Sequence, residues 1–190
     1  MTARFDRGYY QKYYLDSKTA AVSSAEMRAR ALLIAAYCDH IGLPVKRILD
    51  AGCGIGLLRA PLLKALPRAK YTGLEVSEYM CEQFGWVHGT IADYRPRAPF
   101  DLVVCYDVMQ YLDDREATRA LANFARLCRG VLFFSALTTY DWKHNADPDV
   151  HYRSGEWYRE RLRKRFRHIG AGFWIRRGAP LVAWELESAE

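Results

Sequence analysis

The residues with the clearest capacity for chemistry form a glycine-rich turn near position 50. Residues 46–56 read Lys-Arg-Ile-Leu-Asp-Ala-Gly-Cys-Gly-Ile-Gly, and an apolar helix start follows them. Glycines at spacing two let the backbone bend sharply and approach a ligand closely. A buried strand, a glycine turn and a helix in this order form the context that a nucleotide-binding loop requires. The alternative is a tight strand-to-helix turn that binds no ligand.

The residues beside the turn indicate which nucleotide suits it. The dinucleotide pattern G-x-G-x-x-G requires glycine at position 57, where the chain has Leu57. That pattern directs backbone amides at a pyrophosphate, whereas Asp50 places a carboxylate just before the turn. A carboxylate favours a cationic or zwitterionic ligand. S-adenosylmethionine (SAM), which carries a sulfonium and an ammonium but no phosphate, meets this requirement.

The eleven-residue string resembles the first motif of the class I SAM-dependent methyltransferases, which has the form V-L-D-x-G-C-G-x-G. The resemblance covers roughly residues 24–187. It implies that the chain binds SAM, transfers the methyl group and releases S-adenosylhomocysteine (SAH). The cofactor-binding residues that it implies in the turn are Asp50, Ala51, Gly52, Cys53 and Gly54.

Two acids follow later predicted strands. Glu75 ends the second strand, where a carboxylate can accept the hydroxyl protons of a ribose. The resemblance makes Glu75 the ribose ligand and places Val76 against the adenine. It also makes Asp93, flanked by Ala92 and Tyr94, the acceptor for the adenine amino group, through a charge-assisted hydrogen bond. Either acid could instead be a solvated residue at a strand end.

The fourth predicted strand leads into another stretch with family character. Residues 100–112 read Phe-Asp-Leu-Val-Val-Cys-Tyr-Asp-Val-Met-Gln-Tyr-Leu and resemble the family's fourth motif, which usually ends in His-Leu. Here Tyr111 replaces the histidine, so the motif does not supply the usual side chain at that position. By resemblance, Cys105 and Tyr106 lie beside the sulfonium.

The catalytic residues are the least defined part of the prediction. Alignment of donor and acceptor alone lowers the activation free energy of such a reaction by about 7–11 kcal/mol. A general base typically raises the rate by a further ~10²–10⁴-fold. The candidates for a base are His144, His151 and Tyr111. The two histidines could instead be plain loop residues, and Tyr111 could have a structural role. By resemblance, the aromatic N-terminus and the polar segment 138–154 select the acceptor.

Strands and helices alternate along the chain, which indicates a parallel α/β sheet with ligands at the carboxyl ends of its strands. The last two strands would form a hairpin. The resemblance implies one doubly wound sheet of seven strands in the order 3-2-1-4-5-7-6, with strand 7 antiparallel and helices on both faces. The first predicted strand ends near residue 49, and the others cover residues 70–75, 86–88, 101–106, 131–134, 173–177 and 181–186. The predicted helices run from the capping box at Ser23 to near Gly42, over 57–66 with a start or kink at Pro61, and over 78–84, 114–129 and 156–168.

Length and composition bound the class of protein. The 190 residues favour one domain, with 1–44 as a helical and aromatic cap and 45–187 as the core sheet. No apolar run approaches the ~20 residues that span a bilayer, and the N-terminus lacks the apolar segment of a signal peptide, so we expect a cytoplasmic protein. Five cysteines without a C-x-x-C pair and five histidines without ligand spacing argue against disulfides and a metal site.

The sequence thus predicts a SAM-dependent methyltransferase acting on a small molecule, with alternatives. The net charge is +6, and basic side chains gather in residues 159–167. A helix there could hold RNA or an acidic protein as the acceptor, although no nucleic-acid motif accompanies it. A third interpretation is a SAM-binding module without transferase activity. An NAD-dependent oxidoreductase comes last, because Leu57 breaks its pattern.

Overall fold

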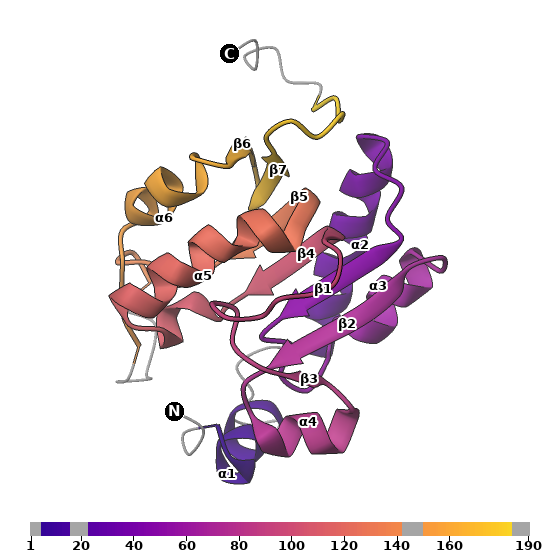
Figure 1. The fold of residues 1–190 in the computed structure, drawn as a ribbon. Helices are drawn as coiled ribbons and strands as arrows, with labels where there is room; N and C mark the ends of the chain where they lie inside the picture. Colours follow the sequence, from indigo (N-terminus) through magenta and orange to yellow (C-terminus); the bar gives the residue numbers. More distant parts are fainter. Residues whose placement is uncertain (1–4, 16–22, 142–149, 184–190) are drawn as a thin grey trace.

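A single seven-stranded sheet organises the chain (Figure 1). The computed structural model describes residues 5–15, 23–141 and 150–183. In these residues the strand order is β3-β2-β1-β4-β5-β7-β6, and β7 runs antiparallel to both β5 and β6. The predicted order and the antiparallel seventh strand are therefore confirmed. The strands are β1 Arg47–Ala51, β2 Lys70–Glu75, β3 Val87–His88, β4 Phe100–Tyr106, β5 Cys128–Ser135, β6 Phe166–Gly170 and β7 Phe173–Arg176.

Helices cover both faces of this sheet, and each face has its own apolar core. On one face Ile34 and Leu62 are fully buried; on the other face Phe124 and Leu162 are nearly or fully buried. Helices α2 and α3 supply the first core, and α5 and α6 supply the second (Figure 1). The helices are α1 Arg7–Tyr10, α2 Ser24–His40, α3 Arg59–Ala65, α4 Glu78–Phe84, α5 Asp114–Leu127 and α6 Gly155–Leu162, with a π-helix at Gln11–Leu15 and a 3₁₀ turn at Met109–Tyr111.

Side-chain caps begin several helices where the sequence predicts them. The Ser23 hydroxyl accepts the backbone N–H of Glu26, and the Glu26 carboxylate returns to the Ser23 N–H, which completes the predicted capping box. The Ser77 hydroxyl caps α4 by accepting the backbone N–H of Met80, without a returning carboxylate. Helix α3 begins at Arg59, so Pro61 does not start it. Pro61 lies in the first turn, where a missing N–H removes no intrahelical hydrogen bond.

The helix predicted over 114–129 ends earlier than expected, and Gly130 does not mark its end. Helix α5 ends at Leu127, and β5 already begins at Cys128. Gly130 lies within β5, where a Cβ atom would come within 2.4 Å of the Asp101 carbonyl oxygen. This glycine therefore permits close packing of β5 against β4, and it serves no helix end.

The closing hairpin also differs from its prediction. Helix α6 stops at Leu162, well before residue 168, and residues 166–170 form β6, which pairs with β7. Residues 181–183 form no strand, and 184–186 lie outside the described residues. Tyr158, Leu162 and Phe166 have helical spacing, but Phe166 is an inward-facing strand residue. The basic segment 159–167 is consequently not one helix.

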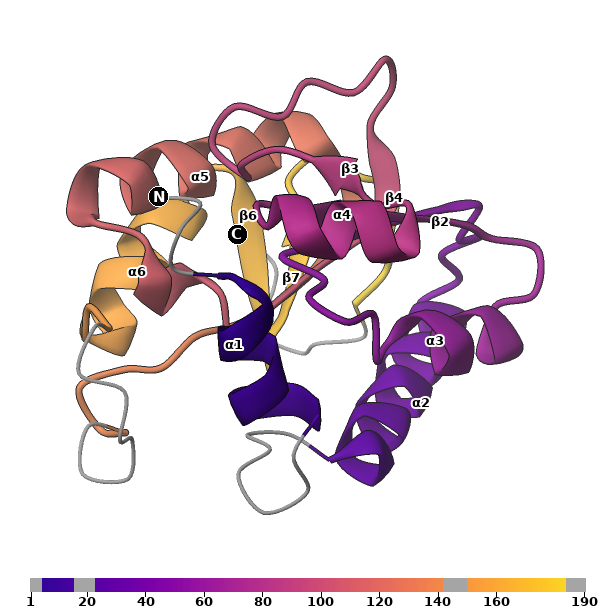
Figure 2. The same cartoon turned by 90° about the horizontal axis from the view of Figure 1, so that it is seen from below.

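The N-terminal segment lies beside α4 at the carboxyl edge of the sheet (Figure 2). The Ser77 hydroxyl donates a hydrogen bond to the Phe5 carbonyl oxygen at 2.6 Å, which ties this segment to the end of β2. No helix in the described residues is both long and apolar enough to cross a membrane.

Candidate functional site

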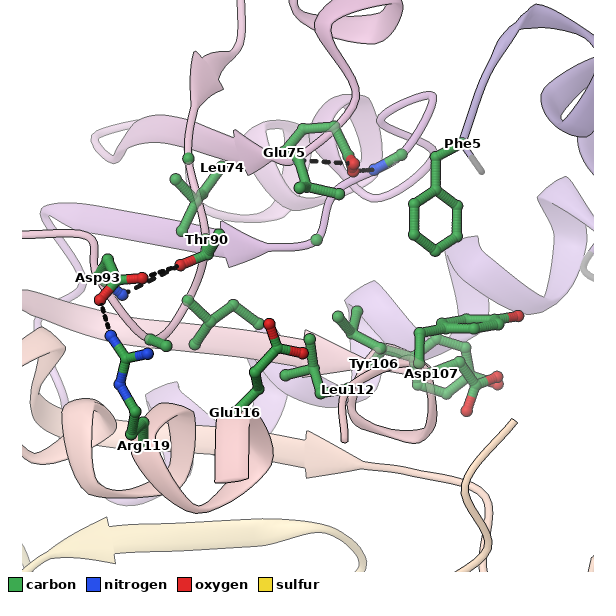
Figure 3. A pocket seen from close by; sticks show the side chains of 18 of the residues that line it. Phe5, Leu74, Glu75, Thr90, Asp93, Tyr106, Asp107, Leu112, Glu116 and Arg119 are labelled. Carbon is green, nitrogen blue, oxygen red and sulfur yellow. Dashed lines mark hydrogen bonds and ion pairs between the residues drawn. The ribbon is translucent and has the colours of Figure 1, made fainter. Parts of the chain in front are cut away.

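A pocket opens at the carboxyl ends of β1, β2 and β4, beneath the N-terminal segment (Figure 3). Phe5, Tyr9 and Tyr10 form the side that the N-terminus contributes. Seven residues of the predicted cofactor site line this pocket: Gly52, Gly54, Glu75, Val76, Ala92, Asp93 and Tyr106. The structure therefore brings together residues from five separate stretches of the sequence.

The glycine turn has a backbone that side chains would obstruct. Gly52, Gly54 and Gly56 have φ angles of 82°, 52° and 75°, in the left-handed region that favours glycine. A Cβ atom on Gly52 would also lie 2.4 Å from a methyl group of Val108. The turn is thus closely fitted against the segment that follows β4.

Glu75 is a buried carboxylate at the floor of the pocket, with only 4% of its surface exposed. Its Oε2 accepts the Gly54 N–H at 2.8 Å, and its Oε1 accepts the N–H groups of Val76 at 2.8 Å and Ser77 at 3.1 Å (Figure 3). A carboxylate has about four acceptor positions, so Oε2 keeps capacity for one more donor. The three N–H groups fix the carboxylate and also tie the glycine turn to β2.

Trp86 packs against the glycine turn and supports it, a role that was not predicted from the sequence. Its indole N–H donates to the Gly54 carbonyl oxygen at 2.9 Å. The indole fills space that side chains at Gly56 and Gly73 would need, since a Cβ on either glycine would lie 2.6 Å from the ring. The glycine in the middle of β2 was the available signal, because an isolated strand glycine often marks a close approach.

Asp50 lies next to the pocket but does not line it. Its carboxylate accepts a hydrogen bond from the Tyr71 hydroxyl at 2.5 Å and is 4% exposed. Burial raises the pKa of Asp50 to about 7, and the negative charge of Glu75 adds to this rise, while the Tyr71 hydrogen bond opposes it. The side chain therefore faces β2, in contrast to the expectation that it faces a cationic ligand.

Asp93 stands at the opposite end of the pocket and is paired within the protein. Its carboxylate forms an ion pair with Arg119, and it accepts a hydrogen bond from the Thr90 hydroxyl at 2.9 Å. Arg119 and Glu116 rise from α5 toward the pocket (Figure 3). Neither residue was predicted for the site, because the strand order decides which helix begins beside this edge of the sheet.

The other predicted cofactor residues pack around the pocket. Ala51 and Cys105 are fully buried in the core. The Cys53 sulfur points toward Gly73, and burial raises the pKa of this thiol. Tyr94 packs against the core cluster on the α5 face.

The candidate bases are dispersed. Tyr111 lines the pocket, and its hydroxyl accepts a hydrogen bond from the Tyr9 hydroxyl at 3.2 Å. His151 is exposed and outside the pocket, and His144 lies outside the described residues. Asp107 does line the pocket, with a φ of 54°, and burial raises its pKa. Such a φ is uncommon for aspartate and fixes the direction of the chain directly after β4.

Arg153 holds the segment that carries Tyr111 in place. Its side chain is 4% exposed and forms an ion pair with Asp114 at 2.8 Å. The same guanidinium donates to the carbonyl oxygens of Met109 at 3.1 Å and Leu112 at 2.6 Å. A planar guanidinium with five N–H groups suits this bridging role. The wall of the pocket after β4 thus depends on a residue more than 40 positions later in the chain.

Comparisons with known proteins add sequence relationships. A family described as a methyltransferase domain matches residues 49–130. Trans-aconitate 2-methyltransferase of Azoarcus sp. (strain BH72) is 32% identical over 103 residues, covering 50% of this chain and 40% of that protein. Ubiquinone biosynthesis O-methyltransferase of the same strain is 31% identical over 112 residues, covering 52% and 47%. The match spans less than half the length of each relative.

Solved structures resemble the chain over a larger share of its length. Magnesium protoporphyrin IX methyltransferase of Synechocystis PCC 6803, solved with SAH, gives a TM-score of 0.67 at 17% identity and covers 92% of this chain and 97% of that one. The 1,6-didemethyltoxoflavin N1-methyltransferase of Burkholderia thailandensis gives 0.63 at 19% identity, covering 92% and 88%. These structural similarities show the fold, and the sequence matches cover about half of the chain. Residues 49–130 therefore match a methyltransferase-domain family, and the fold of the chain is similar to that of methyltransferases solved with SAM or SAH.

Proposed function

We propose that this chain transfers the methyl group of SAM to a small-molecule acceptor and releases SAH. The observation that carries the proposal is the Glu75 carboxylate, buried at the pocket floor with acceptor capacity left on one oxygen. Both curated relatives are named as methyltransferases of small molecules or of a small-molecule pathway. This supports a small-molecule acceptor over RNA or protein, as does the division of the basic segment between α6 and β6.

The residues of the pocket fit SAM. Gly52 and Gly54 line the pocket without side chains, and Glu75 would accept a ribose hydroxyl proton. Val76 and Ala92 offer apolar contacts for an adenine ring. Asp93 would receive the adenine amino group only by sharing its carboxylate with Arg119 and Thr90.

Bound SAM supplies an electrophilic methyl group on a sulfonium. The chain then contributes by aligning the two reactants, which lowers the activation free energy by about 7–11 kcal/mol. Tyr106 and Asp107 sit where β4 ends, between the glycine turn and the N-terminal aromatic residues. We assign them the positioning of the reacting groups, and the half-buried Asp107 carboxylate, which lines the pocket, is the candidate for holding a proton from the acceptor.

Calorimetric titration of the wild-type chain with SAM, SAH and NADH tests the proposal. We expect micromolar binding of SAM and SAH and no heat from NADH. Binding of NADH without the sulfur ligands would show that the choice of nucleotide is wrong. Binding of none of the three would contradict the proposal altogether.

A further inference from the structure

A second cavity, of about 420 Å³, lies on the far side of Tyr106. Tyr106 lines both cavities, so its ring marks the boundary between them. The second cavity is formed by α2, the end of β5, α6 and the β6–β7 turn, all at the carboxyl edge of the sheet. Its volume falls in the range of small-molecule sites, which is about 300–1,000 Å³.

The lining combines flat apolar surfaces with positive charge. The aromatic lining residues are Tyr106, Phe133, Phe134, Tyr158 and Trp174. The basic side chains are Arg30, Arg159 and His168, and the described lining residues include no aspartate or glutamate. A lining of this kind favours a ligand with a flat apolar part and a negative charge.

Arg30 is placed to meet an anion. Its guanidinium carbon lies 3.7 Å from the centre of the Tyr106 ring, which holds the charge at the boundary of the two cavities. Among the described residues Arg30 forms no ion pair within 4.0 Å. Its positive charge nevertheless acts to lower the pKa of the nearby Asp107 and Glu26 carboxyl groups. Its side chain is half-buried, so an anion there would be screened only in part.

Arg159 contributes from the opposite wall. Its Nε binds the Glu156 carboxylate at 2.7 Å, and Glu156 also pairs with Arg163 at 3.0 Å, outside the cavity. The Arg159 guanidinium folds back over Gly155, where a Cβ atom would lie 3.0 Å from Nη1. Because Glu156 offsets part of the charge of Arg159, a singly charged carboxylate suits the cavity better than a doubly charged phosphate.

We propose that the second cavity binds the methyl acceptor, and that this acceptor is a small molecule with a flat apolar body and a carboxylate that Arg30 and Arg159 recognise. This inference rests on the proposed function, because it assigns SAM to the first cavity. The shared Tyr106 would then place the reacting atom of the acceptor next to the methyl group.

The test compares matched probes on the SAH-loaded protein by calorimetry. The probes are hydroxylated aromatic acids, such as 4-hydroxybenzoate and salicylate, each paired with its primary amide, and 4-hydroxyphenyl phosphate. We expect an acid to bind and its amide to bind at least about tenfold more weakly, since a charge-assisted hydrogen bond contributes roughly that factor or more. The phosphate should bind no more tightly than the acid.

Variants locate the effect. Arg30→Gln and Arg159→Gln should each lower the affinity for the acid roughly 10- to 100-fold and leave the affinity for the amide within about twofold. Arg126→Gln, an exposed change on α5 outside both cavities, is the control and should alter neither. Acid binding should be followed by transfer of tritium from methyl-labelled SAM to the acid.

The outcomes separate this inference from the proposed function. Equal binding of acid and amide, tighter binding of the phosphate, or no bound acid on a protein that binds SAH would overturn the acceptor assignment and leave SAM binding intact. An equal loss in Arg126→Gln would also overturn it. Failure of SAH itself to bind would contradict the proposed function. If the acid still bound to that protein, the second cavity would be an anion-binding site and not an acceptor site.

Discussion

Asp50→Asn isolates the cost of a buried carboxyl group beside the glycine turn. The pKa of Asp50 rises from 3.8 to about 7 in the fold. An acid with a raised pKa favours the folded state fully below its unfolded pKa, and this contribution is lost as the pH rises toward the folded pKa. At about 1.4 kcal/mol per pH unit, ionisation of Asp50 lowers the free energy of unfolding by roughly 4 kcal/mol in total. About 3 kcal/mol of this decrease falls between pH 5 and 8.

Asparagine cannot ionise, but its carbonyl oxygen can still accept the Tyr71 hydroxyl. Urea denaturation of both proteins from pH 5 to 8 should therefore show the variant gaining about 3 kcal/mol on the wild type over that range. Tyr71→Phe removes the hydrogen bond that favours the ionised form, so its loss of stability should continue to a higher pH. Parallel pH curves for wild type and Asp50→Asn would refute the reasoning.

Three further predictions concern residues that support the site or the fold. Trp86→Phe removes the indole N–H that Gly54 accepts, and calorimetry should show SAH affinity falling roughly fivefold. Arg153→Met leaves two carbonyl oxygens unpaired, and urea denaturation should show a loss of roughly 2–5 kcal/mol. Ser23→Ala removes a helix cap and should cost about 1 kcal/mol in the same assay with SAH affinity unchanged, because the cap is remote from the pocket.

Local signals in the sequence predict most of the sheet. The glycine turn, the acid that ends β2 and the cap at Ser77 are each specified by neighbours in the chain, and the structure has them where they were expected. The errors arise where one pattern suits two structures. The spacing of Tyr158, Leu162 and Phe166 fits a continuous helix, but the sheet takes Phe166 as a strand residue.

The supports of the pocket could not be predicted in the same way, because they are long-range contacts. Trp86 reaches Gly54 across 32 positions, and Arg153 reaches Met109 across 44. The direction of Asp50 depends on Tyr71 in the neighbouring strand. A sequence pattern gives the residue types at a site, whereas these contacts depend on strand register.

The affinity of Glu75→Gln for SAH tests the central claim most directly. Calorimetry should show it binding SAH roughly 10- to 100-fold more weakly than the wild type, because the amide replaces a carboxylate acceptor. Glu82→Gln, an exposed change on α4, is the matched control and should bind as the wild type does. Circular dichroism must show that both variants are folded. A folded Glu75→Gln protein that binds SAH within about twofold of the wild type would contradict the account.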